Sequence, residues 1–244
     1  GDSITGGGCV HRREAYPTLL GRRLGDRPPP WGFGGWEVEN FGVGSTTATR
    51  ESPHTPYTRT QTFRDALRSR ADVFVVCFGT NDAHKESWSE DGYVRGLCRI
   101  VEFLRASRPC LVLLLTPPPV YSRSGIAAMR SLAIVNRELP GRILPAIARD
   151  LDAPLVDAFE ALGGQQLTGG RFIQWDGVHP NAAGNEIISQ LVCDALVQAA
   201  SDGCLRKARS RRAAAAPGAA SSWSILLGGS PRGRGEEEQE LQEE

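Results

Sequence analysis

Residues 72–78 read Asp-Val-Phe-Val-Val-Cys-Phe, and residues 110–116 read Cys-Leu-Val-Leu-Leu-Leu-Thr. Both stretches are almost continuously apolar and have the length of a β-strand, a pattern typical of strands buried on both faces of a parallel sheet. Two further β-rich runs lie at Trp36–Phe41 and Pro154–Asp157. Together these runs predict a parallel sheet that helices cover on both sides.

Segments of helical length separate these strands. Residues 92–107 place Val94, Leu97, Val101 and Leu104 on one stripe, as an amphipathic helix does. Similar patterns occur in residues 15–24, 130–150 and 182–200. Strands that alternate with helices of this size predict a doubly wound α/β sheet.

Composition excludes several classes of protein. Of 244 residues, 40% are hydrophobic and 23% are charged, which is enough apolar mass for a core and argues against a wholly disordered chain. Lys+Arg and Asp+Glu both number 28, so the balanced charge argues against a strongly basic nucleic-acid binder. The apolar runs are too short to predict a membrane span.

The character of the chain changes near residue 201. Residues 207–212 are basic, residues 213–222 are rich in Ala, Ser, Gly and Pro, and residues 235–244 are rich in glutamate. We therefore expect one domain over residues 1–204 and a low-complexity, disordered tail over residues 205–244. Within that tail only Trp223–Leu227 has a core-forming pattern.

The six cysteines show no CxxC spacing, so neither a zinc site nor a disulfide framework is predicted. Cys77, Cys98, Cys110 and Cys193 lie in apolar segments and read as small buried hydrophobes. No phosphate-cradling loop follows a strand, and we expect no cofactor and no metal. The oligomeric state and the compartment stay open, with secretion as one option.

Four short motifs follow one another along the chain. They are Gly-Asp-Ser-Ile-Thr-Gly at 1–6, Asn-Phe-Gly-Val-Gly-Ser at 40–45, Gly-Thr-Asn-Asp at 79–82 and Trp-Asp-Gly-Val-His-Pro at 175–180. Each motif is weak alone, because a turn or a helix cap explains it equally well. In this order, and each at a strand end or a helix start, the set resembles the SGNH (GDSL) hydrolase family of esterases and lipases.

The resemblance implies a flavodoxin-like three-layer α/β/α fold and ester hydrolysis that depends on serine and histidine. It implies that Ser3 is the nucleophile, His179 the general base and Asp176 the group that orients His179. It also implies an oxyanion hole made by the Ser3 N–H, a glycine N–H of the second motif near Gly44, and the Asn81 side chain.

Chemistry supports the same roles independently. A serine hydroxyl is a poor nucleophile until a neighbouring imidazole takes its proton. His179 alone among the four histidines stands beside a carboxylate in a turn rich in Gly and Pro, three residues after Asp176. That spacing lets the carboxylate reach Nδ1 and leaves Nε2 for the hydroxyl. Sites in parallel sheets gather beyond the carboxyl ends of strands, where Gly44 and Asn81 are expected.

Several residues near the motifs have two readings. Ser45 is a candidate for the position of the family's oxyanion glycine, which leaves two alternatives for the inward-pointing amide, Gly44 and Ser45, and leaves open whether Ser45 has a positive φ. We expect Asp2 and Asp82 to have a structural role, in which they accept hydrogen bonds from loop amides. We expect His84 to be a loop residue rather than a part of the site.

The resemblance also predicts a gap in the sheet. An apolar strand precedes Gly-Asp-Ser in the family pattern and lies mid-sheet, whereas Ser3 is the third residue here. We therefore expect an N-terminally incomplete chain whose central strand is missing. Unpaired buried amides cost about 1–3 kcal/mol each, so such a sheet would be poorly stable.

Residues 115–121 and 175–181 resemble SGNH members grouped with carbohydrate and sialate O-acetylesterases. This predicts removal of a small acyl group, most simply acetyl, from a carbohydrate or other small-molecule ester. Trp175 and Trp88 form an aromatic wall for a sugar ring in one reading and pack in the core in another. Two alternatives remain: a lipid-directed esterase, lysophospholipase or thioesterase, and a non-catalytic carbohydrate-binding relic.

Overall fold

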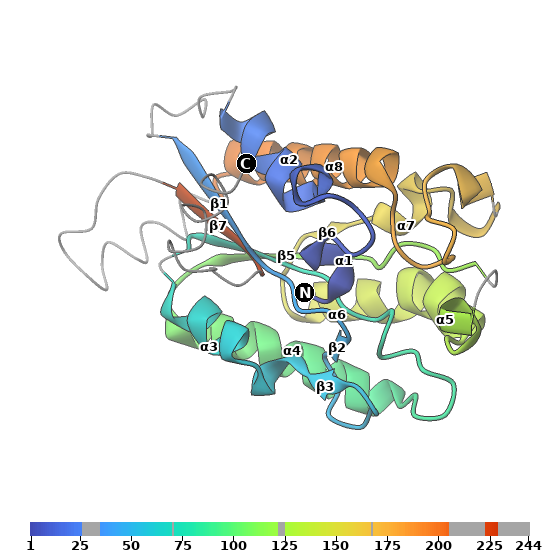
Figure 1. The fold of residues 1–244 in the computed structure, drawn as a ribbon. Helices are drawn as coiled ribbons and strands as arrows, with labels where there is room; N and C mark the ends of the chain where they lie inside the picture. The colour runs from blue at the N-terminus through green and yellow to red at the C-terminus, as the bar shows by residue number, and fades with distance from the viewer. Residues whose placement is uncertain (26–34, 70, 122–124, 167, 205–222, 229–244) are drawn as a thin grey trace, which may run out of the picture.

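The two apolar stretches form neighbouring parallel strands, β4 (Val73–Val76) and β5 (Leu111–Leu115), in the computed structural model (Figure 1). All nine residues of these strands are buried. The structure describes residues 1–25, 35–69, 71–121, 125–166, 168–204 and 223–228. A continuous apolar run has no polar face to turn to water, which is why both strands lie between layers of helices.

The main sheet has five parallel strands in the order β1-β7-β4-β5-β6. The outer strands are β1 (Trp36–Phe41) and β6 (Leu155–Val156). β2 (Thr46–Thr47) and β3 (Thr55–Pro56) form a separate small parallel sheet. The predicted strands all occur, with bounds that agree to within one or two residues.

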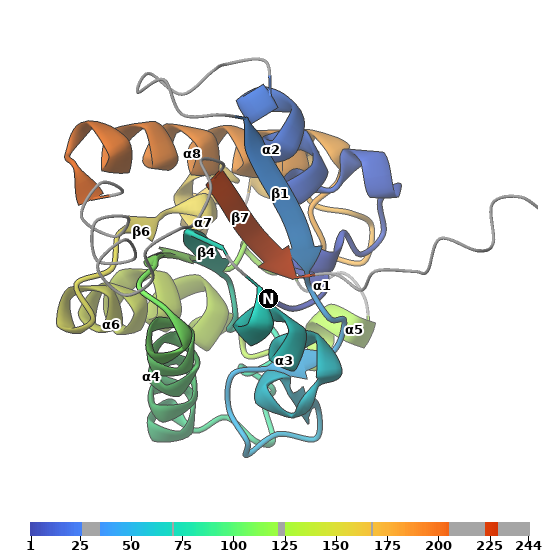
Figure 2. The same cartoon turned by 90° about the vertical axis from the view of Figure 1, so that its left-hand side faces the viewer.

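Alternate side chains of β4 divide the core between two faces. Val73 and Val75 pack in a cluster with α2 (Tyr16–Gly25) and α8 (Ala182–Ser201). Phe74 and Val76 pack on the opposite face in a cluster with α3 (Gln61–Arg68) and α4 (Glu90–Ser107). The sheet thus lies between two helical layers (Figures 1 and 2). This is the expected three-layer α/β/α arrangement of the flavodoxin-like fold.

Residues 130–150 were expected to form one helix, but the first helical element there begins at Ile134 and is a π-helix, which has more residues per turn than an α-helix. A π-helical stretch, η3 (Ile134–Ile143), contains Pro140 and runs on into α6 (Leu144–Asp150). Proline lacks the N–H that an α-helix needs, so a change of winding at this point has a local cause. The shorter helices are α1 (Ser3–Gly6), η1 (Arg12–Glu14), η2 (Tyr57–Arg59), α5 (Gly125–Ala128), α7 (Ala158–Ala161), η4 (Gly164–Gln166) and η5 (Thr168–Arg171). Within the described ranges, no helix combines the length and the apolar character that crossing a bilayer requires.

The structure differs from the expectation at the centre of the sheet. Trp223–Gly228, in the predicted disordered tail, forms β7 and lies between β1 and β4 (Figure 2). Its backbone pairs in parallel with β1 from Trp36 to Phe41 and with β4 at Val73 and Phe74. The position expected to be empty is therefore filled, and the sheet extends past the predicted boundary at residue 204. The rest of the expected tail, 205–222 and 229–244, lies outside the described residues.

Candidate active site

Ser3 begins α1, a four-residue helix that contacts β1 and β7. Asp2 caps this helix, because its Oδ1 accepts a hydrogen bond from the Ile4 amide at 2.9 Å. The Thr5 hydroxyl lies 3.1 Å from the Tyr16 hydroxyl, which ties α1 to α2. Ser3 is thus held, half-buried, in a short turn whose neighbours Asp2, Ile4 and Thr5 are buried.

The motif after β1 lies directly against this turn. The Val43 amide donates to the Gly1 carbonyl at 3.0 Å. A Cβ at Gly42 would lie 2.2 Å from the Gly6 nitrogen, so only glycine permits this close approach. A Cβ at Gly44 would lie 3.9 Å from Ser3 Cβ, which places Gly44 beside the serine. The next residue, Ser45, has a φ of 57°, so it does adopt the positive φ that the sequence left open.

The loop before α8 holds Asp176 and His179 in one tight turn. Asp176 Oδ1 accepts hydrogen bonds from the backbone amides of Val178 at 2.9 Å and His179 at 3.0 Å. Gly177 has a φ of 74°, and a Cβ there would lie 2.1 Å from the Tyr121 carbonyl oxygen. The glycine is required for both reasons, and the turn presents the second carboxylate oxygen to the imidazole.

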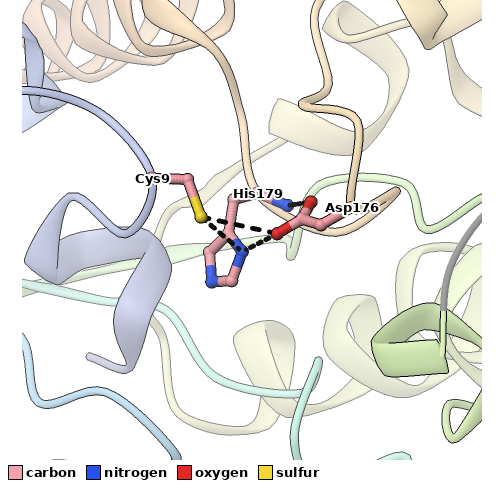
Figure 3. A group of neighbouring side chains, drawn as sticks. All are labelled: Cys9, Asp176 and His179. Carbon is pink, nitrogen blue, oxygen red and sulfur yellow. Dashed lines mark hydrogen bonds and ion pairs between the residues drawn. The ribbon is translucent and has the colours of Figure 1, made fainter.

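Three side chains form a continuous hydrogen-bonded chain. Ser3 Oγ lies 2.8 Å from His179 Nε2, and His179 Nδ1 lies 2.5 Å from Asp176 Oδ2 (Figure 3 shows the His179–Asp176 part). The Asp176 side chain is 1% exposed and that of His179 is 13% exposed. Burial alone would raise the pKa of Asp176, but hydrogen bonds from His179 and Val178 hold that pKa below its usual value. The arrangement can pass a proton from a hydroxyl to an imidazole that a carboxylate keeps oriented.

Asn81 follows β4 and is held at both ends of its amide. Its Oδ1 accepts a hydrogen bond from Arg130 Nη2 at 2.7 Å, and its Nδ2 donates to the Thr46 carbonyl at 3.0 Å. Thr46 is two residues after Gly44, so the Asn81 amide lies close to the loop beside Ser3. Arg130 is 4% exposed, and no sequence motif indicated it. Its contact spans 49 positions along the chain.

Asp2 and Asp82 have the structural role expected of them. Asp82 Oδ1 accepts a hydrogen bond from the Thr49 amide at 2.8 Å, and both carboxylates are buried. Burial raises the pKa of Asp82 to about 7 and raises that of Asp2 as well. His84 pairs with Arg130 in an isolated antiparallel bridge and stacks edge-on against His54, as a loop residue.

Cys9 is a neighbour of the site that sequence reasoning missed. It is exposed, and its Sγ lies 3.5 Å from Asp176 Oδ2 and 3.7 Å from His179 Nδ1 (Figure 3). Burial and the nearby Asp176 carboxylate raise the pKa of its thiol. Its φ of 65° is left-handed, and Gln174 Nε2 donates to its carbonyl at 2.9 Å. The contact to Asp176 spans 167 positions, so no local spacing signals it.

The two tryptophans discussed above have different environments. Trp175 is 77% exposed and stands next to Asp176 in the sequence. Trp88 packs against the core, with its ring centroid 5.6 Å from that of Tyr93. Among the remaining cysteines, Cys77 and Cys193 are buried as expected, whereas Cys98 and Cys110 are only partly buried.

Comparison of the sequence with known families agrees with this geometry. The model of the GDSL-like lipase/acylhydrolase family matches residues 1–187. A curated relative, the acetylxylan esterase of Xylanibacter ruminicola, is 27% identical over 219 residues. The match covers 80% of this chain but 42% of that protein, so the chain spans less than half the length of this relative.

Solved structures share the fold at low sequence identity. A carbohydrate acetylesterase family member from Sinorhizobium meliloti superposes with a TM-score of 0.61 at 19% identity, over 80% of this chain and 94% of that one. The lipase/acylhydrolase of Enterococcus faecalis superposes with a TM-score of 0.64 at 22% identity, over 81% of this chain and 93% of that one. These similarities support the flavodoxin-like assignment.

Proposed function

This chain belongs to the GDSL-like lipase/acylhydrolase family, and we propose that it is a carboxylic ester hydrolase in which Ser3, His179 and Asp176 carry out the hydrolysis. The substrate we propose is a small acyl ester, most simply an acetyl ester of a carbohydrate. The observation that carries the proposal is the hydrogen-bonded chain from Ser3 Oγ through His179 to Asp176, with distances of 2.8 and 2.5 Å.

Ser3 Oγ forms the bond to the acyl carbon while its proton passes to His179 Nε2. The carbonyl electron pair moves onto oxygen and returns when the bond to the sugar oxygen breaks. That oxygen leaves with the proton from Nε2. Water then attacks the acyl-Ser3 ester in the same way, giving the free acid and restoring the hydroxyl.

Asp176 keeps the imidazole in the tautomer that this reaction needs. With Oδ2 at Nδ1, the proton of the neutral ring stays on Nδ1, and Nε2 presents its lone pair to Ser3. The carboxylate also stabilises the imidazolium that forms during proton transfer. Its lowered pKa keeps Asp176 charged at neutral pH.

The developing oxyanion needs hydrogen-bond donors that are already in position. In our proposal these are the Ser3 and Gly44 amides together with Asn81 Nδ2. Arg130 accounts for the direction of the Asn81 side chain, because only the amide oxygen can accept its hydrogen bond at 2.7 Å. Nδ2 then faces the Thr46 side, toward the loop that holds Gly44.

Two observations favour a carbohydrate as the alcohol part of the ester. The Xylanibacter ruminicola relative is named an acetylxylan esterase. Trp175 is 77% exposed beside Asp176, and an exposed indole offers a flat apolar surface on which a sugar ring can stack.

Two measurements test this function. A fluorophosphonate probe should label the wild-type protein and leave Ser3→Ala unlabelled, whereas an unlabelled wild type would favour a non-catalytic relic. p-Nitrophenyl acetate should be hydrolysed with a higher kcat/KM than the octanoate or decanoate ester. A strong preference for the longer chains would instead support a lipid-directed enzyme.

The sugar contact has its own test. Trp175→Ala should raise KM for an acetylated xylo-oligosaccharide and leave that for p-nitrophenyl acetate unchanged. Phe103→Ala is the matched control, because Phe103 is also exposed, at 42%, but lies on α4. Equal KM values for the two variants on the oligosaccharide would contradict a role of Trp175 in binding sugar.

A further inference from the structure

Cys9 Sγ, Asp176 Oδ2 and His179 Nδ1 lie within 4.8 Å of one another (Figure 3). The hydrolytic steps described above make no use of the thiol. Cys9 comes from the loop after α1, whereas Asp176 and His179 come from the turn before α8. Folding therefore brings together three kinds of donor that are common in zinc sites, namely thiolate, imidazole nitrogen and carboxylate oxygen.

We propose that these three atoms form an inhibitory binding site for a thiophilic divalent cation of the Zn²⁺ class. The site would have three protein ligands and a water molecule in the fourth position, the composition of an open tetrahedral site. Cys9 is exposed and gives the cation an entry from solvent, while Asp176 is buried beneath it.

The spacing of the three atoms fits this geometry at two of its three edges. Zinc bonds of ordinary length, at a tetrahedral angle, separate a sulfur ligand from a nitrogen or oxygen ligand by about 3.5 Å. The observed separations from Cys9 Sγ are 3.7 Å to His179 Nδ1 and 3.5 Å to Asp176 Oδ2.

The third edge carries a hydrogen bond. His179 Nδ1 and Asp176 Oδ2 are 2.5 Å apart, and two ligands of one zinc ion need about 3.4 Å. Replacing the proton between these atoms with a cation requires them to separate by about 0.9 Å, which a small rotation of the side chains supplies. Asp176 keeps its two backbone hydrogen bonds through Oδ1, so the turn does not have to unfold.

Binding would stop the proposed hydrolysis through the imidazole tautomer. A metal ion takes the Nδ1 lone pair, so the ring proton moves to Nε2, and the Cys9 thiol releases its proton to solvent. Nε2 then carries a hydrogen and cannot accept the proton of Ser3, which is 2.8 Å away. The cation thus inhibits the reaction of Ser3 without binding to Ser3 itself.

The first test uses Zn²⁺ as the inhibitor of p-nitrophenyl acetate hydrolysis. Zn²⁺ should inhibit the wild type, and EDTA should restore activity. Cys9→Ala should raise the inhibitory Zn²⁺ concentration by more than about tenfold, because even outer-shell partners of a metal contribute that much to affinity. Cys204→Ala, which removes a partly buried thiol on a different segment, should behave as the wild type. Equal Zn²⁺ sensitivity of Cys9→Ala and wild type would overturn the proposal.

The second test does not depend on hydrolysis. Co²⁺ added to Ser3→Ala should produce the thiolate-to-cobalt charge-transfer band in the near ultraviolet, and the band should be absent from the Ser3→Ala, Cys9→Ala double variant. Its absence from Ser3→Ala would also overturn the site. A band in Ser3→Ala, combined with a wild-type protein that hydrolyses no ester, would uphold the metal site and reject the proposed function. If Cys9→Ala melts at a lower temperature than wild type, Cys9→Ser takes its place in both tests.

Discussion

Replacing Asp176 with asparagine would test how the turn before α8 controls His179. Asp176 Oδ1 accepts two backbone hydrogen bonds, from Val178 at 2.9 Å and from His179 at 3.0 Å. In Asp176→Asn the amide oxygen must take this position, because an NH₂ group cannot accept hydrogen bonds from N–H groups. The NH₂ group is then forced to the position of Oδ2, 2.5 Å from His179 Nδ1.

This geometry predicts a folded protein with the wrong tautomer. The NH₂ group donates to Nδ1, so the ring proton moves to Nε2 and faces Ser3, which then has no acceptor for its own proton. In a Ser-His-Asp triad this change lowers kcat by about four orders of magnitude, or about 5 kcal/mol of barrier. The melting temperature should stay close to that of wild type, because both backbone hydrogen bonds persist.

The assay is kcat for p-nitrophenyl acetate at neutral pH, with thermal unfolding followed by circular dichroism. Asp65→Asn on α3 is the matched control and should retain full activity, because among the described contacts the Asp65 carboxylate hydrogen-bonds only to neighbouring side chains of its own helix. A folded Asp176→Asn protein that keeps more than a tenth of wild-type kcat would refute the orienting role of the carboxylate.

Three further predictions follow from other parts of the structure. Arg130→Met should lower kcat by about tenfold or more with little change in KM, because the Asn81 amide loses the hydrogen bond that directs it. An unchanged kcat in steady-state assays would contradict this role of Arg130. Deleting residues 205–244 should abolish cooperative unfolding, because β7 pairs with both β1 and β4 and unpaired buried amides cost about 1–3 kcal/mol each. Deleting only residues 229–244, which leaves β7 in place, is the control. Equal melting temperatures for the two deletions would count against a stabilising role of β7. Wild-type stability to urea should fall between about pH 4 and pH 7, because the folded-state pKa of Asp82 is raised to about 7 and its ionisation in the buried site opposes folding. Asp82→Asn should show a smaller decline, with the raised pKa of Asp2 accounting for part of what is left, and a pH profile identical to that of wild type would argue against this role of Asp82.

Local sequence patterns predicted most of the fold. The apolar runs of β4 and β5 avoid water only when layers of helices cover both faces of the sheet. The amphipathic segments that separate the strands in the sequence supply these layers. The winding of η3 was not predicted, because a hydrophobic stripe reports which face is buried and does not distinguish α from π hydrogen bonding around Pro140. The place of β7 was missed for a different reason, since parallel partners are chosen by backbone pairing between segments far apart in the chain.

The candidate site also contains contacts that the sequence predicted and contacts that it did not. His179 and Asp176 are three residues apart, so a turn explains their contact, and the resemblance added Ser3 and Asn81. No sequence motif signals the contacts of Arg130 with Asn81 and of Cys9 with Asp176, and only the tertiary structure shows them.

By itself, the sequence determined four strands of the main sheet, the helical segments 15–24, 92–107 and 182–200, and which polar residues lie at the ends of strands, because periodicity and turn chemistry act over a few residues. Only the tertiary structure decided that Ser3 meets His179 across 176 positions and that a thiol lies beside the same imidazole. Those contacts arise from the packing of whole elements against one sheet, and packing depends on the complete set of buried surfaces rather than on any short stretch of residues.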